Sequence, residues 1–248
     1  MAAAGTQQFS DAKVELGQLN TYKKRIPRMS EFEDDGTWVW ICFASEFRLV
    51  LAHVIGERKQ YIADRLIGLT EKRLSSLPLF VSDGLKFYAK ALLKSYGQRK
   101  MFSPTGKRGR PRKPKVLPSG DLMYAKIVKQ RENGRLKKVT KEIVFGKVTE
   151  AQLISTSLIE RLNLTLRQDN NRISRKTIGF SKKIEKLDAQ MSLYFCNYNF
   201  CRAHRSLRHH NEDGVIEVNC PAKEYGLINH NWSLRELLTY PYHITATY

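Results

Sequence analysis

The chain has 248 residues, of which 42% are hydrophobic and 27% are charged. This balance is typical of a folded chain with one large or two small domains, and it excludes a disordered or fibrous protein. Lysine and arginine number 43 against 24 acidic residues, which gives a formal net charge of +19. Such an excess indicates a polyanionic partner, either nucleic acid or an anionic membrane surface.

A membrane-spanning protein is excluded by the hydropathy pattern. The longest apolar run covers residues 38–44, far fewer than the roughly 20 residues that a spanning helix needs. The first residues lack a basic start followed by an apolar stretch, so we expect no secretion signal. The four cysteines form no C-x-x-C pair and suit a reducing compartment. We therefore expect a cytoplasmic protein without a membrane partner.

The first hundred residues predict three strands, a helix, a fourth strand and a second helix. Alternating, β-branched and aromatic residues favour strands over 14–22, 37–43 and 47–55. Apolar residues at helical spacing favour a helix over 57–75. A short apolar strand over 77–82 then delivers Asp83 at its end, and a helix is expected over 85–96.

The next segment concentrates positive charge. Proline and glycine exclude a helix over 107–115, so we expect an extended, exposed basic ribbon. Its Arg-Gly-Arg-Pro core resembles the AT-hook, whose extended backbone lies in the minor groove. Contact with phosphates explains the same composition without sequence readout, and this is the favoured interpretation. The DNA contacts expected here are those of Lys107, Arg108, Arg110, Arg112 and Lys113.

The rest of the chain predicts a hairpin followed by helices. Strands over 123–130 and 139–147 flank Asn133-Gly134, a strong hairpin signal. Helices are expected over 150–168 and 181–200, and a loop-rich tail contains a short helix over 233–240. This order predicts the α/β class and a ribonuclease H-like fold. We expect a mixed five-stranded sheet with flanking helices, formed by 10–97 and 149–202. The ribbon and hairpin of 98–148 would be an insertion before the helix that carries Glu160, and 203–248 a tail.

Two carboxylates stand out in this framework. Asp83 follows a buried strand, although an Asp-Gly pair there equally caps the next helix. Glu160, Asn163 and Arg167 share one face of the expected helix, where Glu160 alone would form an ordinary surface ion pair. Paired carboxylates in a strongly basic protein, however, are what two-metal phosphoryl transfer needs.

The glutamate segment resembles a known family. Residues 158–168, with 175–182, resemble the block around the last carboxylate of DDE transposases of the insertion-sequence-one family. Val-Ser-Asp-Gly at 81–84 resembles its second-aspartate motif. Residues 38–40 and 51–58 resemble the family's second and third strands, and residues 232–238 resemble its C-terminal tail. The resemblance spans residues 13–240. It implies a ribonuclease H-like domain, Mg²⁺ or Mn²⁺ as cofactor, double-stranded DNA as partner, a homo-oligomer and association with the nucleoid.

The resemblance also assigns roles to single residues. It implies that Asp83 and Glu160 are catalytic and bind metal, and that Arg167 contacts the DNA backbone near the scissile phosphate. The other DNA contacts that it implies are those of Arg161, Asn163, Arg175, Lys176 and Lys182.

One departure from the family pattern concerns the first aspartate. The family has apolar-Asp-Glu-apolar in its opening strand, where this chain has Gly17 and Gln18. Since that aspartate bridges both metals, its loss should remove most of the catalytic power. Glu15 lies on the same strand face as Gly17, about 6.6 Å away, and is a possible substitute. Two functions remain open: a Mg²⁺-dependent DDE transposase, or a catalytically inactive relative that binds DNA and regulates.

Other candidate functions and sites are less favoured. A nuclease for RNA–DNA hybrids would share the fold, but the glutamate block argues against it. Cys196, Cys201 and His204 fit no structural zinc spacing, so we expect them to be packing residues. His53 is expected to be a core histidine.

Overall fold

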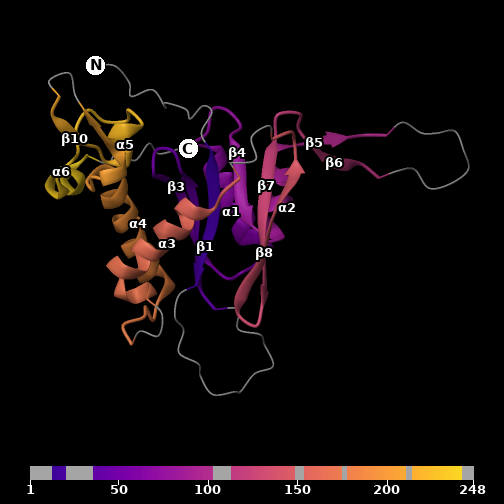
Figure 1. The fold of residues 1–248 in the computed structure, drawn as a ribbon, viewed down its shortest axis with the longest axis horizontal. Coiled ribbons are helices and arrows are strands. Elements are labelled where there is room, and N and C mark those ends of the chain that lie inside the picture. The colour runs from indigo at the N-terminus through magenta and orange to yellow at the C-terminus, as the bar shows by residue number, and fades with distance from the viewer. Residues whose placement is uncertain are drawn as a thin grey trace, which may run out of the picture.

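The computed structural model describes residues 13–20, 36–102, 113–148, 154–174, 178–210 and 214–241. Six strands form one mixed sheet in the order β3-β2-β1-β4-β7-β8 (Figure 1). β1, β4 and β7 run parallel, whereas β2, β3 and β8 each pair antiparallel with a neighbour. This order is compatible with a ribonuclease H-like fold. The strands are β1 (Val14–Asn20), β2 (Trp38–Ala44), β3 (Leu49–Gly56), β4 (Leu79–Asp83), β7 (Met123–Glu132) and β8 (Arg135–Phe145).

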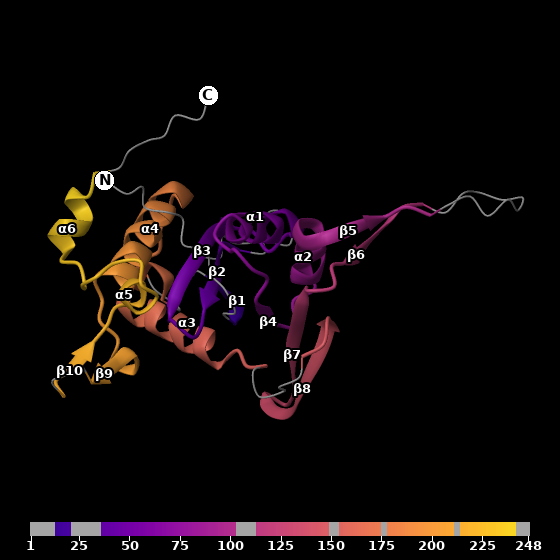
Figure 2. The ribbon, with the colours of Figure 1, turned by 90° about the horizontal axis from the view of Figure 1, so that it is seen from above.

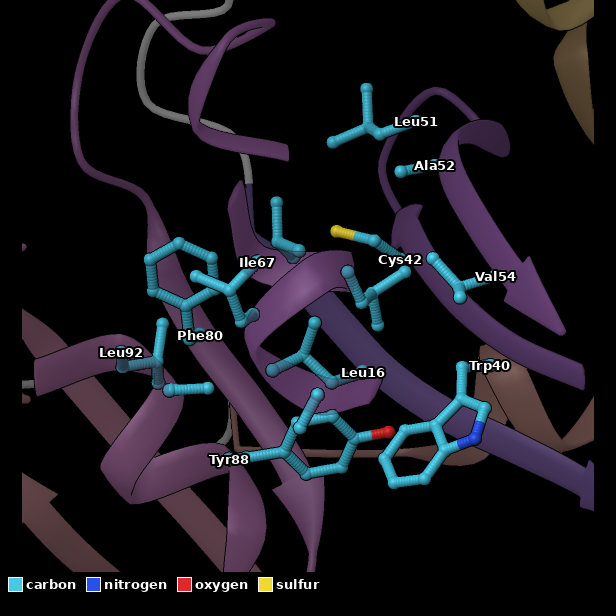
Figure 3. Close-up of a cluster of buried hydrophobic side chains, with 14 of the residues drawn as sticks. Leu16, Trp40, Cys42, Leu51, Ala52, Val54, Ile67, Phe80, Tyr88 and Leu92 are labelled. Carbon is cyan, nitrogen blue, oxygen red and sulfur yellow. The ribbon is translucent and has the colours of Figure 1, made fainter. Parts of the chain in front are cut away.

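Helices cover both faces of the sheet (Figure 2). α1 (Gln60–Glu71) and α2 (Phe87–Tyr96) pack on one face, and α3 (Ser157–Asp169) and α4 (Ile184–Phe200) on the other. Because side chains alternate along a strand, Leu16 joins the core beneath α1 and α2, while Leu19 joins the core beneath α3 and α4. Figure 3 shows the first of these cores, where the Trp40 and Tyr88 rings meet edge to face with centroids 5.7 Å apart.

The expected five-stranded sheet with a separate hairpin was wrong. β7 pairs in parallel with β4, which places Ala125 opposite Val81, so the first hairpin strand is the fifth strand of the main sheet and β8 is the sixth. Burial explains this pairing, because Ala125 and Ile127 pack with Val81 and Ile154 in one apolar cluster. The helix expected over 150–168 begins at Ser157, since 154–156 are not helical.

A two-stranded arm leaves the body between α2 and β7. β5 (Gly97–Lys100) pairs antiparallel with β6 (Lys115–Pro118), and the arm points away from the sheet in both views (Figures 1 and 2). The sequence predicted an extended ribbon here but not these strands. Lys113 is exposed next to β6. Lys107, Arg108, Arg110 and Arg112 lie outside the described residues.

The C-terminal part is more ordered than the expected loop-rich tail. It contains a small hairpin of β9 (Arg208–His210) and β10 (Ile216–Val218), then α5 (Pro221–Glu224) and α6 (Leu234–Thr239). α6 lies where a helix was predicted, and Ser233 and Glu236 form a reciprocal cap at its start. Within the described part of the chain, no helix combines the length and apolar character needed to cross a membrane.

Candidate functional site

The parallel pairing of β1 with β4 determines which residues meet at the end of β4. Glu15 lies opposite Val81 and Leu16 opposite Ser82, so the next step of this register places Gly17 beside Asp83. Leu19 packs beneath α3, and Val81 lies opposite Glu15, whose carboxylate bonds to the α3 residue Ile159, so strand alternation puts Gly17 and Asp83 on the side that α3 covers. Gly17, Asp83 and the α3 residue Glu160 are called the acidic corner below.

The space in front of Gly17 is filled by α3. A Cβ atom added at Gly17 would lie 2.6 Å from Cδ1 and 2.9 Å from Cγ1 of Ile159. Ile159 is only 2% exposed and belongs to the core beneath α3 and α4. The residue next to Glu160 therefore occupies the place into which any side chain at position 17 would extend.

The Glu15 carboxylate bonds to α3 and to Lys13. The side chain of Glu15 is fully buried, and Oε2 accepts a 2.8 Å hydrogen bond from the backbone N–H of Ile159. That N–H lies in the first turn of α3, where backbone donors have no partner within the helix. Oε1 lies 2.9 Å from Nζ of Lys13. The predicted substitute for the missing aspartate is thus engaged in holding the start of α3 against β1.

Asp83 is exposed at the end of β4. Its Oδ1 accepts a 3.2 Å hydrogen bond from the backbone N–H of Leu85, so the aspartate also stabilises the turn that leads into α2. Burial raises the pKa of the neighbouring Tyr124 to about 12, and the negative charge of Asp83 adds to this effect. Asp83 therefore contributes negative potential at the end of the strand.

Glu160 is exposed on the first turn of α3 and is paired with a cation. Its Oε1 forms an ion pair with Nζ of Lys129 and accepts a 2.9 Å hydrogen bond from Thr156 Oγ1. Lys129 stands two residues beyond Ile127, the residue opposite Asp83 in β7. The sequence reasoning missed Lys129, because only the pairing of β7 with β4 brings it to the acidic corner.

The acidic corner does not fit a two-metal centre. The strand position that should supply the bridging carboxylate is a glycine covered by Ile159, and Glu15 is held by Lys13 and α3. Among the described residues, no three His, Cys, Asp or Glu side chains gather closely enough to hold a metal ion. This includes Cys196, Cys201 and His204, the set considered for zinc.

Of the DNA-contacting residues predicted on α3 and between α3 and α4, four are described by the structure and two are not. Arg161 is exposed, and Asn163 and Arg167 are half-buried further along α3. Lys182 is exposed just before α4, where it lines a hollow with Arg172. Arg175 and Lys176 lie outside the described residues. The structure thus places Arg161, Asn163, Arg167 and Lys182 on or beside the helices that cover the acidic corner's face of the sheet, whereas Lys113 is exposed on the arm.

The histidines and cysteines have ordinary environments. His53 is half-buried, packs against Phe195 and lies 3.5 Å from a carboxylate oxygen of Asp188. Cys42 and Cys220 are buried, whereas Cys196 is exposed on α4.

The mixed sheet, with Asp83 at the end of the central strand β4 and Glu160 on the helix α3 that packs on the neighbouring strand β1, is compatible with the ribonuclease H-like class of α/β proteins. Residues 135–201, from β8 through α4, match the family model described as IS1 transposase. This match confirms the resemblance over the segment that it covers, which includes the helix that carries Glu160. The comparisons with curated proteins and with solved structures found no significant match.

Proposed function

We propose that this protein is a transposase relative that binds double-stranded DNA and does not itself cut it. The IS1 transposase match over residues 135–201 supports DNA as the partner and polynucleotidyl transfer as the family's chemistry. One observation supports the proposal that the protein does not cut DNA. Gly17 stands beside Asp83 where the family has a carboxylate, and Ile159 fills the space that a side chain there would need.

Two-metal phosphoryl transfer requires ligands for two divalent ions. In two-metal phosphoryl transfer, the ions activate the attacking oxygen and stabilise the leaving oxygen. This chain keeps Asp83 and Glu160, but Glu160 already has Lys129 as its positive partner. We therefore propose no Mg²⁺- or Mn²⁺-dependent step for the protein.

Binding to DNA is supported by the charge and its position. The formal charge of +19 favours a polyanion. Exposed cations lie on the β5–β6 arm (Arg99, Lys100, Lys115), on the β7–β8 hairpin (Arg131, Arg135, Lys137, Lys138, Lys141) and at Arg161 of α3. We propose that these surfaces track the phosphates of duplex DNA. The family relation suggests in addition that the protein acts as a homo-oligomer in the nucleoid.

The proposal is tested by measuring binding and cleavage on the same duplex and on supercoiled plasmid. We expect tight binding whose log K falls steeply with log salt, by about 0.9 for each phosphate contacted. We expect no nicking with Mg²⁺ or Mn²⁺. Weak binding with a flat salt response would overturn the DNA-binding function.

Nicking that disappears in both Asp83→Asn and Glu160→Gln would overturn the loss of cutting and restore the enzyme hypothesis. In that case, loss of nicking in Glu15→Ala as well would identify Glu15 as the substitute ligand. The folding of each variant is checked by its thermal unfolding, because Glu15 is buried.

A further inference from the structure

A basic hollow lies at the far end of α3 from the acidic corner. Its volume is about 600 Å³, and it opens between the end of α3, the 3-10 turn Asn171–Ile173 and the start of α4. Four cationic side chains from these segments line it: Arg172, Lys182, Lys183 and Lys186. Phe180 forms part of the wall.

The acidic residue at the hollow is neutralised by partners behind it. Asp169 forms an ion pair with Arg202 and accepts a 2.6 Å hydrogen bond from the Tyr194 hydroxyl. Partial burial alone would raise the pKa of Asp169, but these two partners outweigh it and hold the pKa below its usual range. The charge that the hollow presents to a ligand is therefore strongly positive.

The walls of the hollow are held together by hydrogen bonds. Arg172 Nη1 lies 3.2 Å from Oγ of Ser181, which ties the 3-10 turn to the segment before α4. Asn170, only 5% exposed, donates to the backbone oxygen of Leu166 and accepts from Nε2 of Gln190. The first turn of the 17-residue helix α4 adds the positive end of its dipole. These hydrogen bonds hold in place the segments from which the cationic side chains extend.

We infer that this hollow binds a backbone phosphate of the duplex that lies over the acidic corner. This inference rests on the proposed DNA binding and goes beyond it, because it names Arg172, Lys183 and Lys186 as phosphate contacts and fixes the direction of the duplex. Asn170 follows Glu160 by ten residues of helix, or about 15 Å at 1.5 Å per residue. Successive phosphates of one DNA strand are spaced by about 3.4 Å along the axis of the duplex. A phosphate at the hollow would therefore lie about four base pairs from one at Glu160.

The test compares two charge-matched double variants in duplex binding. Lys183→Gln/Lys186→Gln removes two cations of the hollow. Lys72→Gln/Lys90→Gln removes two exposed cations, one directly after α1 and one on α2, on the opposite face of the sheet. We expect the first variant to lower the slope of log K against log salt by about 0.9, the contribution of the one phosphate held in the hollow, and the control to leave the slope unchanged.

Three outcomes separate the possibilities. If the wild-type protein binds DNA and the two variants behave alike, the hollow is not a phosphate site, while the proposed function stands. If the wild-type protein does not bind DNA, the proposed function fails first. If Lys183→Gln/Lys186→Gln loses binding of inorganic tripolyphosphate but keeps the wild-type salt slope for the duplex, the hollow serves free phosphates and the inference of a DNA contact is overturned.

Discussion

Glu15 and Ile159, which are 144 positions apart in the chain, are joined by a 2.8 Å hydrogen bond from the Ile159 backbone N–H to the Glu15 carboxylate. Two residues further along β1, Gly17 lets the Ile159 side chain approach the strand more closely than any other residue would allow. The helix that carries Glu160 is thus fixed to β1 both by a buried polar contact and by close packing.

Removing the Glu15 carboxylate should destabilise the protein. Glu15→Ala leaves a backbone N–H and Lys13 without their buried acceptor, which should lower the free energy of unfolding by about 2–3 kcal/mol. Glu15→Gln keeps an acceptor for the N–H and should cost less. Urea unfolding measures both against Glu46→Ala, a change at an exposed glutamate. An equal effect of Glu15→Ala and Glu46→Ala would contradict the capping role.

Restoring an aspartate at position 17 should require two substitutions. Gly17→Asp alone forces Ile159 to move, because the new Cβ would lie 2.6 Å from its Cδ1. Gly17→Asp/Ile159→Ala removes the colliding atoms, although loss of the isoleucine side chain alone costs about 2–5 kcal/mol. We expect Mn²⁺-dependent plasmid nicking from the double variant only. Nicking by Gly17→Asp at the level of the double variant would show that Ile159 does not block the site.

Neutralising Glu160 should strengthen DNA binding. Without bound metal, an exposed carboxylate beneath the duplex repels its phosphates, so Glu160→Gln should raise the affinity by about two- to fivefold in EDTA. Glu71→Gln, at the end of α1 on the other face of the sheet, should have no effect. Weaker binding by Glu160→Gln would indicate that DNA does not pass over the acidic corner.

His204 should make stability depend on pH. Burial, with smaller effects from Arg202 and Arg48, lowers the pKa of His204 from 6.5 to about 4, and its ring packs 4.5 Å from that of Tyr198. Between these pH values the unfolded chain binds more protons, so this contribution is complete above pH 6.5 and is lost as the pH falls toward 4. After allowance for solvent screening, the loss should be about 1–2 kcal/mol.

Urea unfolding of the wild-type protein and of His204→Gln at pH 7 and pH 4.5 measures this contribution. The variant should lose less stability on acidification, while a change at the exposed His210 to Gln should leave the wild-type dependence intact. Identical pH dependence in wild type and His204→Gln would show that His204 titrates normally in the fold.

The basic ribbon should contribute affinity without sequence preference. Changing Lys107, Arg108, Arg110 and Arg112 to glutamine should lower the salt slope by about 3–4, because each phosphate contact contributes about 0.9. The loss of affinity should be equal on A·T-rich and G·C-rich duplexes. A loss confined to A·T-rich DNA would instead support minor-groove reading of the AT-hook kind.

Local patterns predicted most of the fold. The structure has β1 to β4, α1, α2 and α4 close to their predicted ranges. These elements were predictable because hydrophobic periodicity and turn residues depend only on neighbouring positions in the sequence. The pairing of β7 with β4 was not predictable in this way, since it joins strands separated by α2 and the arm. The ion pair between Lys129 and Glu160 depends on that pairing and was missed for the same reason.

The candidate site could be predicted only in part. The family pattern singled out Gly17, which lies one step beyond the Leu16–Ser82 pair in the register of β1 and β4. It did not indicate what fills the vacated space, because Ile159 reaches Gly17 only through the packing of α3 on β1. The contact that Glu15 makes was also not predictable from local sequence patterns, because its partner Ile159 lies in a helix distant in the sequence.

The contact between Gly17 and Ile159 couples substitutions at these two positions. An aspartate introduced at position 17 alone would collide with Ile159 in the core, and a smaller residue introduced at position 159 alone would leave a void. Either single change destabilises the fold, so the structure accommodates an aspartate at position 17 only when position 159 changes with it.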